Sequence, residues 1–522
     1  MNLTELLQCV RMNTFIDRRK IKIQNKERNW MNMKKTITGL LVLAMLLSAL
    51  SACGETPAQT TDAGTAPDAA DPAAAETIEE TEPEETELSD NLPEKDFGGA
   101  DFSIWGDVAE YGYFYTAELT GEVIDDAVYN RNAEVSERFN VNFVYNLDEA
   151  GKWRDMNLLN NSVMAGAQAY DLATGVACYL SNAVIAGSLQ NLNTKDYLDF
   201  TQPWWSAHIN RELTIGDRLY IASGFYDMPT VARAHVVFYS TDLAEKYAIG
   251  NLYDIVREGT WTFETMLSLA EQALVDLDGN GVYDENDQYG ITSQWDVLGI
   301  DYGASGHSFS SREEGNITFT EYDEKLLAAN DMLYNLLYNT DYYYSGYTKG
   351  GPHNYDNMTN VFADNRALFF PNSIVYASDD RLREMGTYGI LPTPKFTEDQ
   401  ETYGTYTSCF TSGIPADAPD VEKSCIILEA LSAESYKSVL PAYYDIALSQ
   451  KFLNDKDSVE MLDIVFENTC CEFSYMFQGG WGAEIALSVG LNENYASWYA
   501  SKMKAYNKML VKMIEKILAL DY

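Results

Sequence analysis

In the first part of the folded region, segments with the apolar spacing of strands alternate with segments that have the apolar spacing of helices. Residues 101–105, 141–145 and 170–174 show the short apolar patterns that are typical of strands. Between them, residues 122–139 and 156–168 place apolar side chains at helical spacing. Strands that alternate with helices predict right-handed βαβ units around a mainly parallel sheet.

The pattern changes in the last part of the chain. Residues 410–522 contain few strand signals, and we expect them to be mostly helical. The globular, aromatic-rich composition runs from residue 97 to the end, about 425 residues, which exceeds what one core comfortably supports. We therefore expect an α/β protein with two lobes.

A short apolar segment near the N-terminus predicts export. Residues 37–50 are apolar, follow two lysines and end in the small residues before Cys53, which is the composition of a secretory signal. The run is shorter than the roughly 20 residues of a membrane-spanning helix. Its end resembles a bacterial lipobox, in which the cysteine is lipidated and becomes the mature N-terminus. The alternative is a plain signal peptide with an incidental cysteine.

We expect residues 1–52 to be removed. Met33 begins a signal of ordinary length, so residues 1–32 are interpreted as an over-extended reading frame. Residues 54–95 are rich in Ala, Thr, Pro, Asp and Glu, with almost no large apolar side chains. Such a segment cannot offset its ordering entropy by burial. Residues 53–95 are therefore predicted to be a lipidated, disordered, acidic tether, with a flexible-coil span of roughly 35–40 Å.

The charge of the chain excludes two classes of partner. The sequence has 36 Lys and Arg against 79 Asp and Glu, a net charge of −43. The predicted leader is basic, so the mature chain is more acidic still. This balance argues against nucleic acid and against charge-driven binding to an anionic membrane.

One loop carries the spacing of a calcium site. Counting Asp276 as position 1, oxygen side chains occupy positions 1, 3, 5, 9 and 12, with Gly281 at position 6, as in an EF-hand loop. Position 12 is Asp287 rather than the usual glutamate, which resembles the loops of dockerins and of some periplasmic binding proteins. A structural Ca²⁺ is predicted; the alternative is a turn that binds no metal. The predicted ligands are Asp276, Asp278, Asn280, the Val282 carbonyl, Asp284 and Asp287.

No catalytic motif stands out, so we expect a protein that is not an enzyme. The four histidines form no His-Glu-x-x-His pair, and neither Gly-x-Ser-x-Gly nor a phosphate-binding glycine loop occurs. A pair of carboxylates for glycoside hydrolysis stays an open alternative among so many acidic residues. The cysteines after the tether lack Cys-x-x-Cys spacing and are odd in number, so they predict no disulfide framework.

Several segments resemble the solute-binding lipoproteins of Gram-positive ABC importers, of the extracellular family 1 type that includes many carbohydrate binders. The resemblance covers nearly all of residues 97–522 and lies in the order of four weak patterns along the chain. These patterns are residues 217–222 followed by 236–243, then 259–266, 362–369 and 388–394.

The resemblance implies a type II periplasmic-binding-protein-like fold, with mainly parallel sheets flanked by helices and a helical C-terminal segment. The expected first lobe is 96–232 plus 373–409, and the second is 233–370 plus 410–522. Chain crossovers between the lobes are expected at 226–236, 368–372 and 405–411. Two lobes joined in this way close on a ligand by hinge motion.

The resemblance and the aromatic content together predict a sugar as ligand. Sugars offer hydroxyls to polar groups and C–H faces to aromatic rings, and the chain has 9 Trp and 36 Tyr. For any single tryptophan, packing in the core is the alternative. The candidate ligand contacts are Trp105, Tyr113, Trp205 with its neighbour Trp204, Asp227, Trp295 and Trp481.

These predictions describe a lipid-anchored protein on the outer face of the cell membrane. It would capture a carbohydrate, expected to be an oligosaccharide, and pass it to the transmembrane subunits of an ABC permease. The alternatives are a binder of another solute, such as a peptide, and a lipid-anchored carbohydrate-active enzyme.

Overall fold

A computed structural model describes residues 88–106, 111–147, 156–304, 308–313, 316–347, 354–449, 456–477 and 488–520. The chain divides into two units, Met1–Leu88 and Ser89–Tyr522. The predicted signal, Cys53 and nearly all of the tether lie outside the described residues. Everything below concerns the second unit.

The first sheet has the strand order β12-β3-β1-β2. It comprises β1 (Ala100–Gly106), β2 (Val141–Leu147), β3 (Leu172–Val176) and β12 (Phe410–Gly413). β1 runs parallel to β2 and β3, whereas β12 is antiparallel to β3. The three strands predicted from the apolar pattern are confirmed, but the fourth comes from the region expected to be helical. This sheet and its helices are called the first lobe.

Helix α2 (Val123–Phe139) shows how the pattern becomes structure in this lobe. Val128, Val135 and Phe139 lie on one face and are buried. Asn140 ends the helix with a φ of 51°, a left-handed conformation that asparagine tolerates better than most residues. The other helices of this lobe are α3 (Asn157–Met164), α4 (Ala177–Ala186), α5 (Ala207–Leu213), α14 (Val421–Glu434) and α15 (Leu440–Ser449).

The second sheet has the order β10-β4-β9-β5-β8. Its strands are β4 (His235–Ser240), β5 (Tyr289–Gln294), β8 (Tyr343–Tyr347), β9 (Ala367–Ser373) and β10 (Tyr388–Leu391). β5 is parallel to β8 and β9, while β4 is antiparallel to β9 and β10. Both sheets are therefore mixed, with parallel pairs beside antiparallel ones. This sheet and its helices are called the second lobe.

Helices cover the second sheet, and Phe238, Phe362 and Phe370 form the centre of a core beneath them. The tight packing of these rings leaves the three side chains fully buried. The helices are α7 (Thr241–Lys246), α8 (Leu252–Arg257), α9 (Phe263–Glu271), α10 (Trp295–Ala304), α11 (Glu324–Asn339), α12 (Tyr355–Ala363), α13 (Asp380–Met385) and α16 (Lys456–Glu467).

The predicted division of the chain between the lobes is wrong in two places. Residues 373–409 were expected in the first lobe, but β10 pairs with β4 in the second sheet. Residues 410–522 were expected in the second lobe; α16 does pack there, but β12 pairs with β3 in the first sheet and α14 packs on α2. The backbone hydrogen bonds of these strands decide their place, and local sequence does not encode them.

The predicted crossover at 368–372 is also wrong, because these residues form the buried strand β9. The other two predicted crossovers do join the lobes. In the first, α6 (Pro229–Ala232) leads into β4; in the third, β11 (Thr405–Tyr406) leads into β12. The two segments meet where Ala234 and Thr407 form an isolated bridge.

Three smaller elements lie where the lobes meet. β6 (Ser310–Glu313) and β7 (Asn316–Phe319) form a hairpin. β13 (Thr469–Cys470) runs parallel to β11. The short helix α17 (Phe473–Met476) follows β13 and packs against α4 and α5 of the first lobe.

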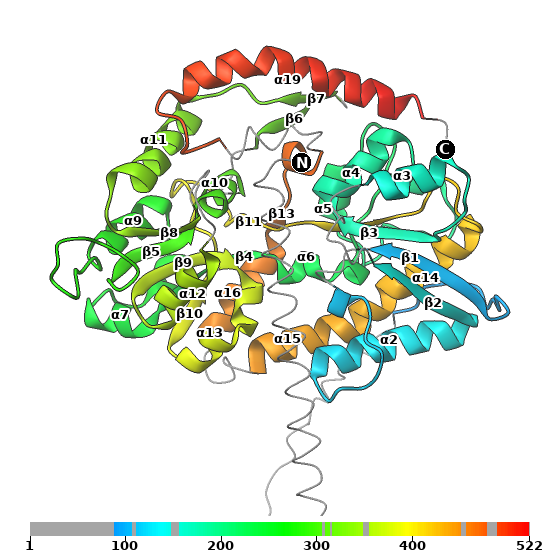
Figure 1. Ribbon diagram of the computed structural model, residues 1–522, viewed down its shortest axis with the longest axis horizontal. Helices are drawn as coiled ribbons and strands as arrows, with labels where there is room; N and C mark the ends of the chain where they lie inside the picture. The colour runs from blue at the N-terminus through cyan, green and yellow to red at the C-terminus, as the bar shows by residue number, and fades with distance from the viewer. Residues whose placement is uncertain are drawn as a thin grey trace, which may run out of the picture. The chain divides into compact units, whose positions relative to one another are not determined.

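The long helix α19 (Tyr495–Leu518) extends across both lobes (Figure 1). It packs against α4 on one side and against β7 and α11 on the other. The Nη1 atom of Arg218 donates a hydrogen bond to the Ile517 carbonyl at 3.2 Å, and the Tyr499 hydroxyl donates one to the Thr320 carbonyl. Because the last carbonyls of a helix lack intrahelical donors, Arg218 satisfies the end of α19.

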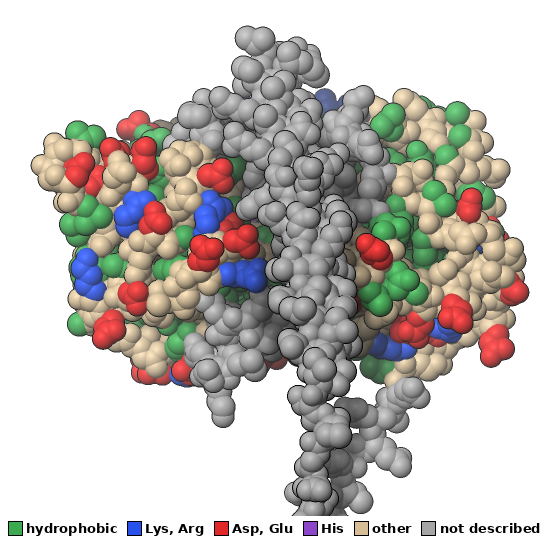
Figure 2. Space-filling model, turned by 60° about the horizontal axis from the view of Figure 1, so that its bottom comes forward, with side chains coloured by type: hydrophobic (Ala, Val, Ile, Leu, Met, Phe, Trp, Pro, Cys, Tyr) green, Lys and Arg blue, Asp and Glu red, His purple; other side chains and the backbone are tan. Residues whose placement is uncertain are grey.

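Among the described residues, no helix is both long enough and apolar enough to cross a bilayer. On the face drawn in Figure 2, acidic, basic and apolar side chains are intermingled. The described surface on this face therefore presents a mixture of charges to solvent, despite the acidic composition of the chain.

Candidate functional site

The strand-to-helix turns of both lobes define where a ligand would bind. In open α/β sheets, ligands bind beyond the carboxyl ends of the parallel strands. β1 ends at Trp105-Gly106, and β3 leads into α4 in the first lobe. In the second lobe, β5 leads into α10, which begins with Trp295. We take these turns as the candidate site.

Trp105 lies at the carboxyl end of β1 as predicted, but its side chain is buried, with 3% exposure. In the sheet it pairs with Ala173 of β3. The next residue, Gly106, approaches Thr174 so closely that a Cβ atom there would lie 3.1 Å from the threonine methyl. The strand end is therefore closely packed, which favours a structural role for this tryptophan.

Asp227 is fully buried beside the first crossover. One carboxylate oxygen accepts hydrogen bonds from the hydroxyls of Ser412 at 2.8 Å and Thr174 at 3.2 Å, and the other accepts from the Gly224 amide. Burial raises the pKa of Asp227 to about 7, against the opposing effect of these hydrogen bonds. Asp227 thus ties β3, β12 and the crossover together, and its oxygens are already used within the first lobe.

Trp205 is buried together with Trp204 and is 3% exposed. Both indole N–H groups donate to the Glu429 carboxylate of α14, at 2.8 Å from Trp204 and 3.0 Å from Trp205. Burial raises the pKa of Glu429 to about 7. This arrangement favours a packing role for both tryptophans.

Tyr113 is half-buried, and its ring lies tilted against that of Tyr443, with ring centroids 6.5 Å apart. Its carbonyl accepts from the guanidinium of the buried Arg131, which also lies over the Tyr226 ring at 5.1 Å. Of the four candidates in the first lobe, Tyr113 is the most exposed.

Trp295 begins α10 in the second lobe and is 8% exposed. The following residue, Asp296, is half-buried. Trp481 lies outside the described residues.

The sequence did not predict a buried His–Asp pair that lies at the hinge. The Nδ1 atom of His235, at the start of β4, lies 2.5 Å from an Asp301 carboxylate oxygen on α10. The ring of His235 also packs against Tyr406 of β11, with centroids 5.1 Å apart. Because these residues are far apart in sequence and belong to no motif, no local pattern could have found them.

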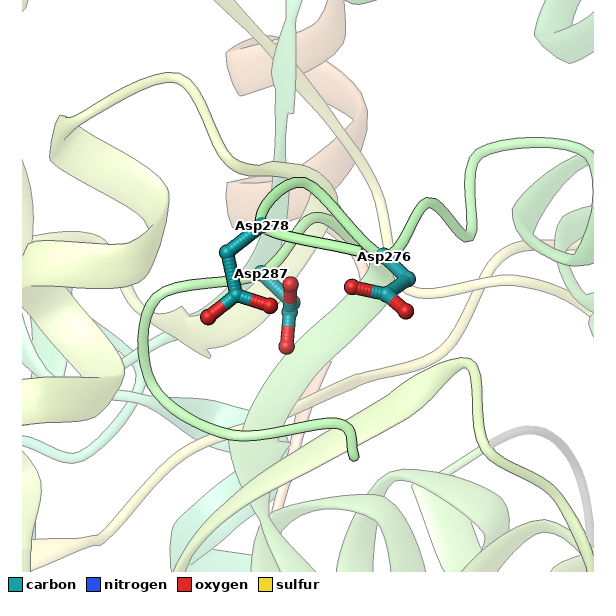
Figure 3. A group of neighbouring side chains, drawn as sticks. All are labelled: Asp276, Asp278 and Asp287. Atoms are coloured by element: carbon teal, nitrogen blue, oxygen red, sulfur yellow. The ribbon is translucent and has the colours of Figure 1, made fainter. Parts of the chain in front are cut away.

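The calcium loop lies between α9 and β5, and it brings three carboxylates together (Figure 3). One oxygen from each of Asp276, Asp278 and Asp287 lies within 4.8 Å of the others. Asp287 is fully buried, and Asp278 is exposed. These three fill positions 1, 3 and 12 of the predicted ligand set, and hard oxygen donors suit Ca²⁺.

The other predicted ligands have partners within the loop. The side-chain oxygen of Asn280 accepts a hydrogen bond from the Val282 amide at 2.6 Å. The Val282 carbonyl stays the predicted metal ligand at position 7. Asp284 accepts from the Asn286 amide and lies outside the group of three, as position 9 often does when it acts through water. Hydrogen bonds from Gly279 and Gly281 lower the pKa of Asp276, so its carboxylate is kept ionised. The residues therefore fit a calcium ion.

No disulfide joins the cysteines of the described region. Cys178, Cys409, Cys425 and Cys471 are buried, and Cys470 is half-buried. Burial raises the pKa of Cys425 to about 12, which disfavours the reactive thiolate.

Two solved structures share this two-lobed architecture. The galacto-N-biose-/lacto-N-biose I-binding protein of an ABC transporter from Bifidobacterium longum, in complex with lacto-N-biose, aligns with a TM-score of 0.52 and 13% identity. The alignment covers 81% of this chain and 99% of that chain. The GacH receptor of Streptomyces glaucescens, solved unliganded and with acarbose, aligns with a TM-score of 0.51 and 14% identity over 79% and 98% of the two chains.

This likeness shows the fold: the chain has the two-lobed α/β fold of the solute-binding proteins of ABC transporters. No family model and no curated protein sequence matches the chain.

Proposed function

We propose that this protein is the solute-binding subunit of an ABC importer and that its ligand is a carbohydrate, expected to be an oligosaccharide. The observation that supports this is the fold, which spans nearly the whole length of two sugar-binding proteins of this kind. The strand-to-helix turns of both lobes also carry aromatic and acidic side chains, including Trp295 and Asp296. Such groups stack on sugar rings and accept their hydroxyls.

We further propose that Cys53 carries lipid and that residues 53–95 tether the binding body to the outer face of the membrane. Two acyl chains hold a protein stably where a single chain does so only marginally. A tether also keeps captured ligand near the permease at a high effective concentration. The protein would hand over its ligand unchanged, without catalysis.

We propose a structural Ca²⁺ in the loop of Asp276, Asp278 and Asp287. The Val282 carbonyl, Asn280 and Asp284 would complete the set, and the ion would neutralise the converging carboxylates. No ligand-binding step depends on it.

A binding screen on the purified mature chain tests the ligand class. The panel would contain di- to hexasaccharides, including lacto-N-biose and acarbose, and a matched set of short peptides, each read by thermal shift and then by calorimetry. A saturable rise in melting temperature with a saccharide, without turnover of it, supports the proposal. Binding of peptides alone, or hydrolysis of the saccharide, would overturn it.

A further inference from the structure

Four lysines form a row on the solvent side of α19, in a chain that is strongly acidic as a whole. They are Lys504, Lys508, Lys512 and Lys516, and all four are exposed. Residues four apart in a helix lie next to each other on its surface, so this lysine row extends over roughly 18 Å of α19. Glu515 is the single acidic residue of the helix.

The body of the protein does not neutralise the lysine row. None of its four side chains forms an ion pair with the described part of the chain. By contrast, Lys95 pairs with Glu422 and Lys437 pairs with Glu434. The ammonium groups of the row are therefore available to a partner of opposite charge.

Helix stability does not account for the lysine row. Like charges four positions apart destabilise a helix, and the row consists of such pairs. Lysines in the last turn favour the helix dipole, but Lys504 and Lys508 lie in the middle of α19. A solvated face could also carry mixed charges, as the face drawn in Figure 2 does. The row is therefore better explained by a contact that its positive charge favours.

Exposed apolar side chains accompany the lysines in the carboxyl-terminal half of α19. Met509, Val511 and Leu518 are 41%, 51% and 39% exposed. The buried side chains of the helix, such as Leu510 and Ile517, face the lobes instead. Ammonium groups with apolar groups among them suit a phospholipid surface, where the lysines meet phosphates and the apolar groups enter the headgroup region.

The acidity of the chain does not cancel the lysine row at short range. At physiological ionic strength, exposed charges act over about 8 Å, which is less than the diameter of about 10–12 Å of a helix with its side chains. A surface in contact with α19 therefore interacts mainly with the charges of that helix. The expectation drawn from the net charge of −43 holds for the chain as a whole and not for this one face.

We propose that the lysine row docks α19 on the anionic phospholipid surface of the membrane. The partner is the bilayer, whose phosphate headgroups supply the opposite charge. This inference rests on the proposed function, which brings the chain to the membrane through its tether. Because α19 extends across both lobes and packs against both (Figure 1), its docking orients the whole binding body on the membrane.

Cosedimentation with vesicles tests this contact in the full mature chain, purified without its lipid. One set of vesicles contains phosphatidylglycerol and phosphatidylcholine in equal amounts, and the other contains phosphatidylcholine alone. We expect binding to the anionic vesicles that weakens as salt is added, because salt screens exposed charges. We expect no binding to the phosphatidylcholine vesicles.

The test variant combines Lys504→Gln, Lys508→Gln and Lys512→Gln. Its partition onto anionic vesicles should fall about a hundredfold, since each lysine near such a surface contributes about 1 kcal/mol and 1.4 kcal/mol is tenfold. Lys516 is left unchanged, because a lysine in the last turn also stabilises the helix end. The melting temperature should stay that of the wild type, since the replaced side chains are exposed.

The matched control combines Lys95→Gln, Lys246→Gln and Lys437→Gln. These lysines lie at the surface outside α19 and have partners in Glu422, Gln288 and Glu434. The control has the same net charge as the test variant but keeps the lysine row. It therefore separates the effect of the row from that of total charge.

The outcomes distinguish this inference from the proposed function. Loss of vesicle binding in the test variant alone, with an unchanged melting temperature, supports the docking surface. Equal binding of the test variant and the control overturns it, as does a wild-type chain that binds soluble polyglutamate but no anionic vesicle. The assay contains no saccharide, so a wild-type chain that binds vesicles but no sugar of the panel overturns the proposed ligand and supports this surface.

Discussion

The imidazole of His235 and the carboxylate of Asp301 are 2.5 Å apart and almost completely buried, with side-chain exposures of 5% and 2%. This contact joins the first strand after the crossover to helix α10. A polar group that is buried without its partner costs about 1–3 kcal/mol. We therefore expect Asp301→Ala to lower the free energy of unfolding by about that amount.

Urea denaturation of the apo protein measures this effect. Asp380→Ala is the control, because Asp380 is an exposed residue of α13 whose pair with Arg383 spans 3.6 Å, and such pairs contribute little. Equal stability of the Asp301 variant and the control would contradict the prediction.

Glu429 predicts a pH dependence of stability. Burial raises its pKa from 4.5 to about 7 although Trp204 and Trp205 donate to it. The folded state then holds its proton at pH values where the unfolded chain has released it, so unfolding becomes easier as pH rises from about 4.5 to about 7. The shift corresponds to roughly 3 kcal/mol.

Glu429→Gln should flatten this part of the stability curve, which denaturation at half-unit pH steps would show. Asp227, whose pKa burial also raises to about 7, still titrates in the variant and leaves a residual slope. Parallel curves for wild type and variant between pH 4.5 and 7 would contradict the assignment to Glu429.

Calcium should stabilise the chain without being required for ligand binding. Binding to the folded state alone adds about 2.7 kcal/mol at 100 times the Kd, so a chelator should lower the melting temperature and added Ca²⁺ should restore it. Asp278→Ala should abolish this response, because it removes one of the three converging carboxylates. The fold should be kept, since Asp278 is exposed and the hydrogen bonds accepted by the buried Asp287 stay in place.

Asp364→Ala serves as the control for that loop. Asp364 is an exposed partner of Arg366 and belongs to no group of converging carboxylates among the described residues. Loss of ligand affinity on chelation would show that the ion has more than a structural role.

Arg218 anchors the last turn of α19 to the first lobe, where its guanidinium bonds the Ile517 carbonyl. Arg218→Ala should lower stability by about 1–2 kcal/mol, since a charged donor is lost from otherwise unsatisfied carbonyls. Amide hydrogen exchange would locate the change in the last turn of α19. Protection that is unchanged there would mean that Arg218 does not hold the helix end.

Cys53→Ser tests the proposed anchor. We expect the wild-type protein in the membrane fraction of the producing cell and the variant in the medium or the soluble fraction, because the variant has no thiol to acylate. Cys425→Ser is the control, since Cys425 is a buried thiol of α14. Equal distribution of wild type and Cys53→Ser would argue for a plain signal peptide.

Local patterns predicted the parts of the fold that local physics decides. β1, β2 and α2 follow from periods of two and about 3.6 residues. The loop spacing likewise predicted three carboxylates that converge in the structure, those of Asp276, Asp278 and Asp287, because the positions of the loop are close in sequence. The sheet memberships of β10 and β12 could not be predicted in this way, since strand pairing depends on segments far away in the chain.

The candidate ligand residues show the same limit. Its residue type made Trp205 a candidate for contact with a sugar, but its indole N–H donates a hydrogen bond to Glu429, which is 224 residues away in the chain. Conversely, His235 and Asp301 belong to no motif, and only the assembled hinge brings them together. Whether an aromatic ring faces solvent or core is a property of the assembled lobes.

The position of β12 has a consequence for how the chain folds. Thr411 donates to the Gly175 carbonyl across 236 residues of chain, so the edge of β3 stays unpaired until three-quarters of the protein has been made. Contacts of such long range slow folding, and an open strand edge invites pairing with other chains. Truncation before residue 410 should therefore yield an aggregating fragment rather than a smaller, independently folded domain.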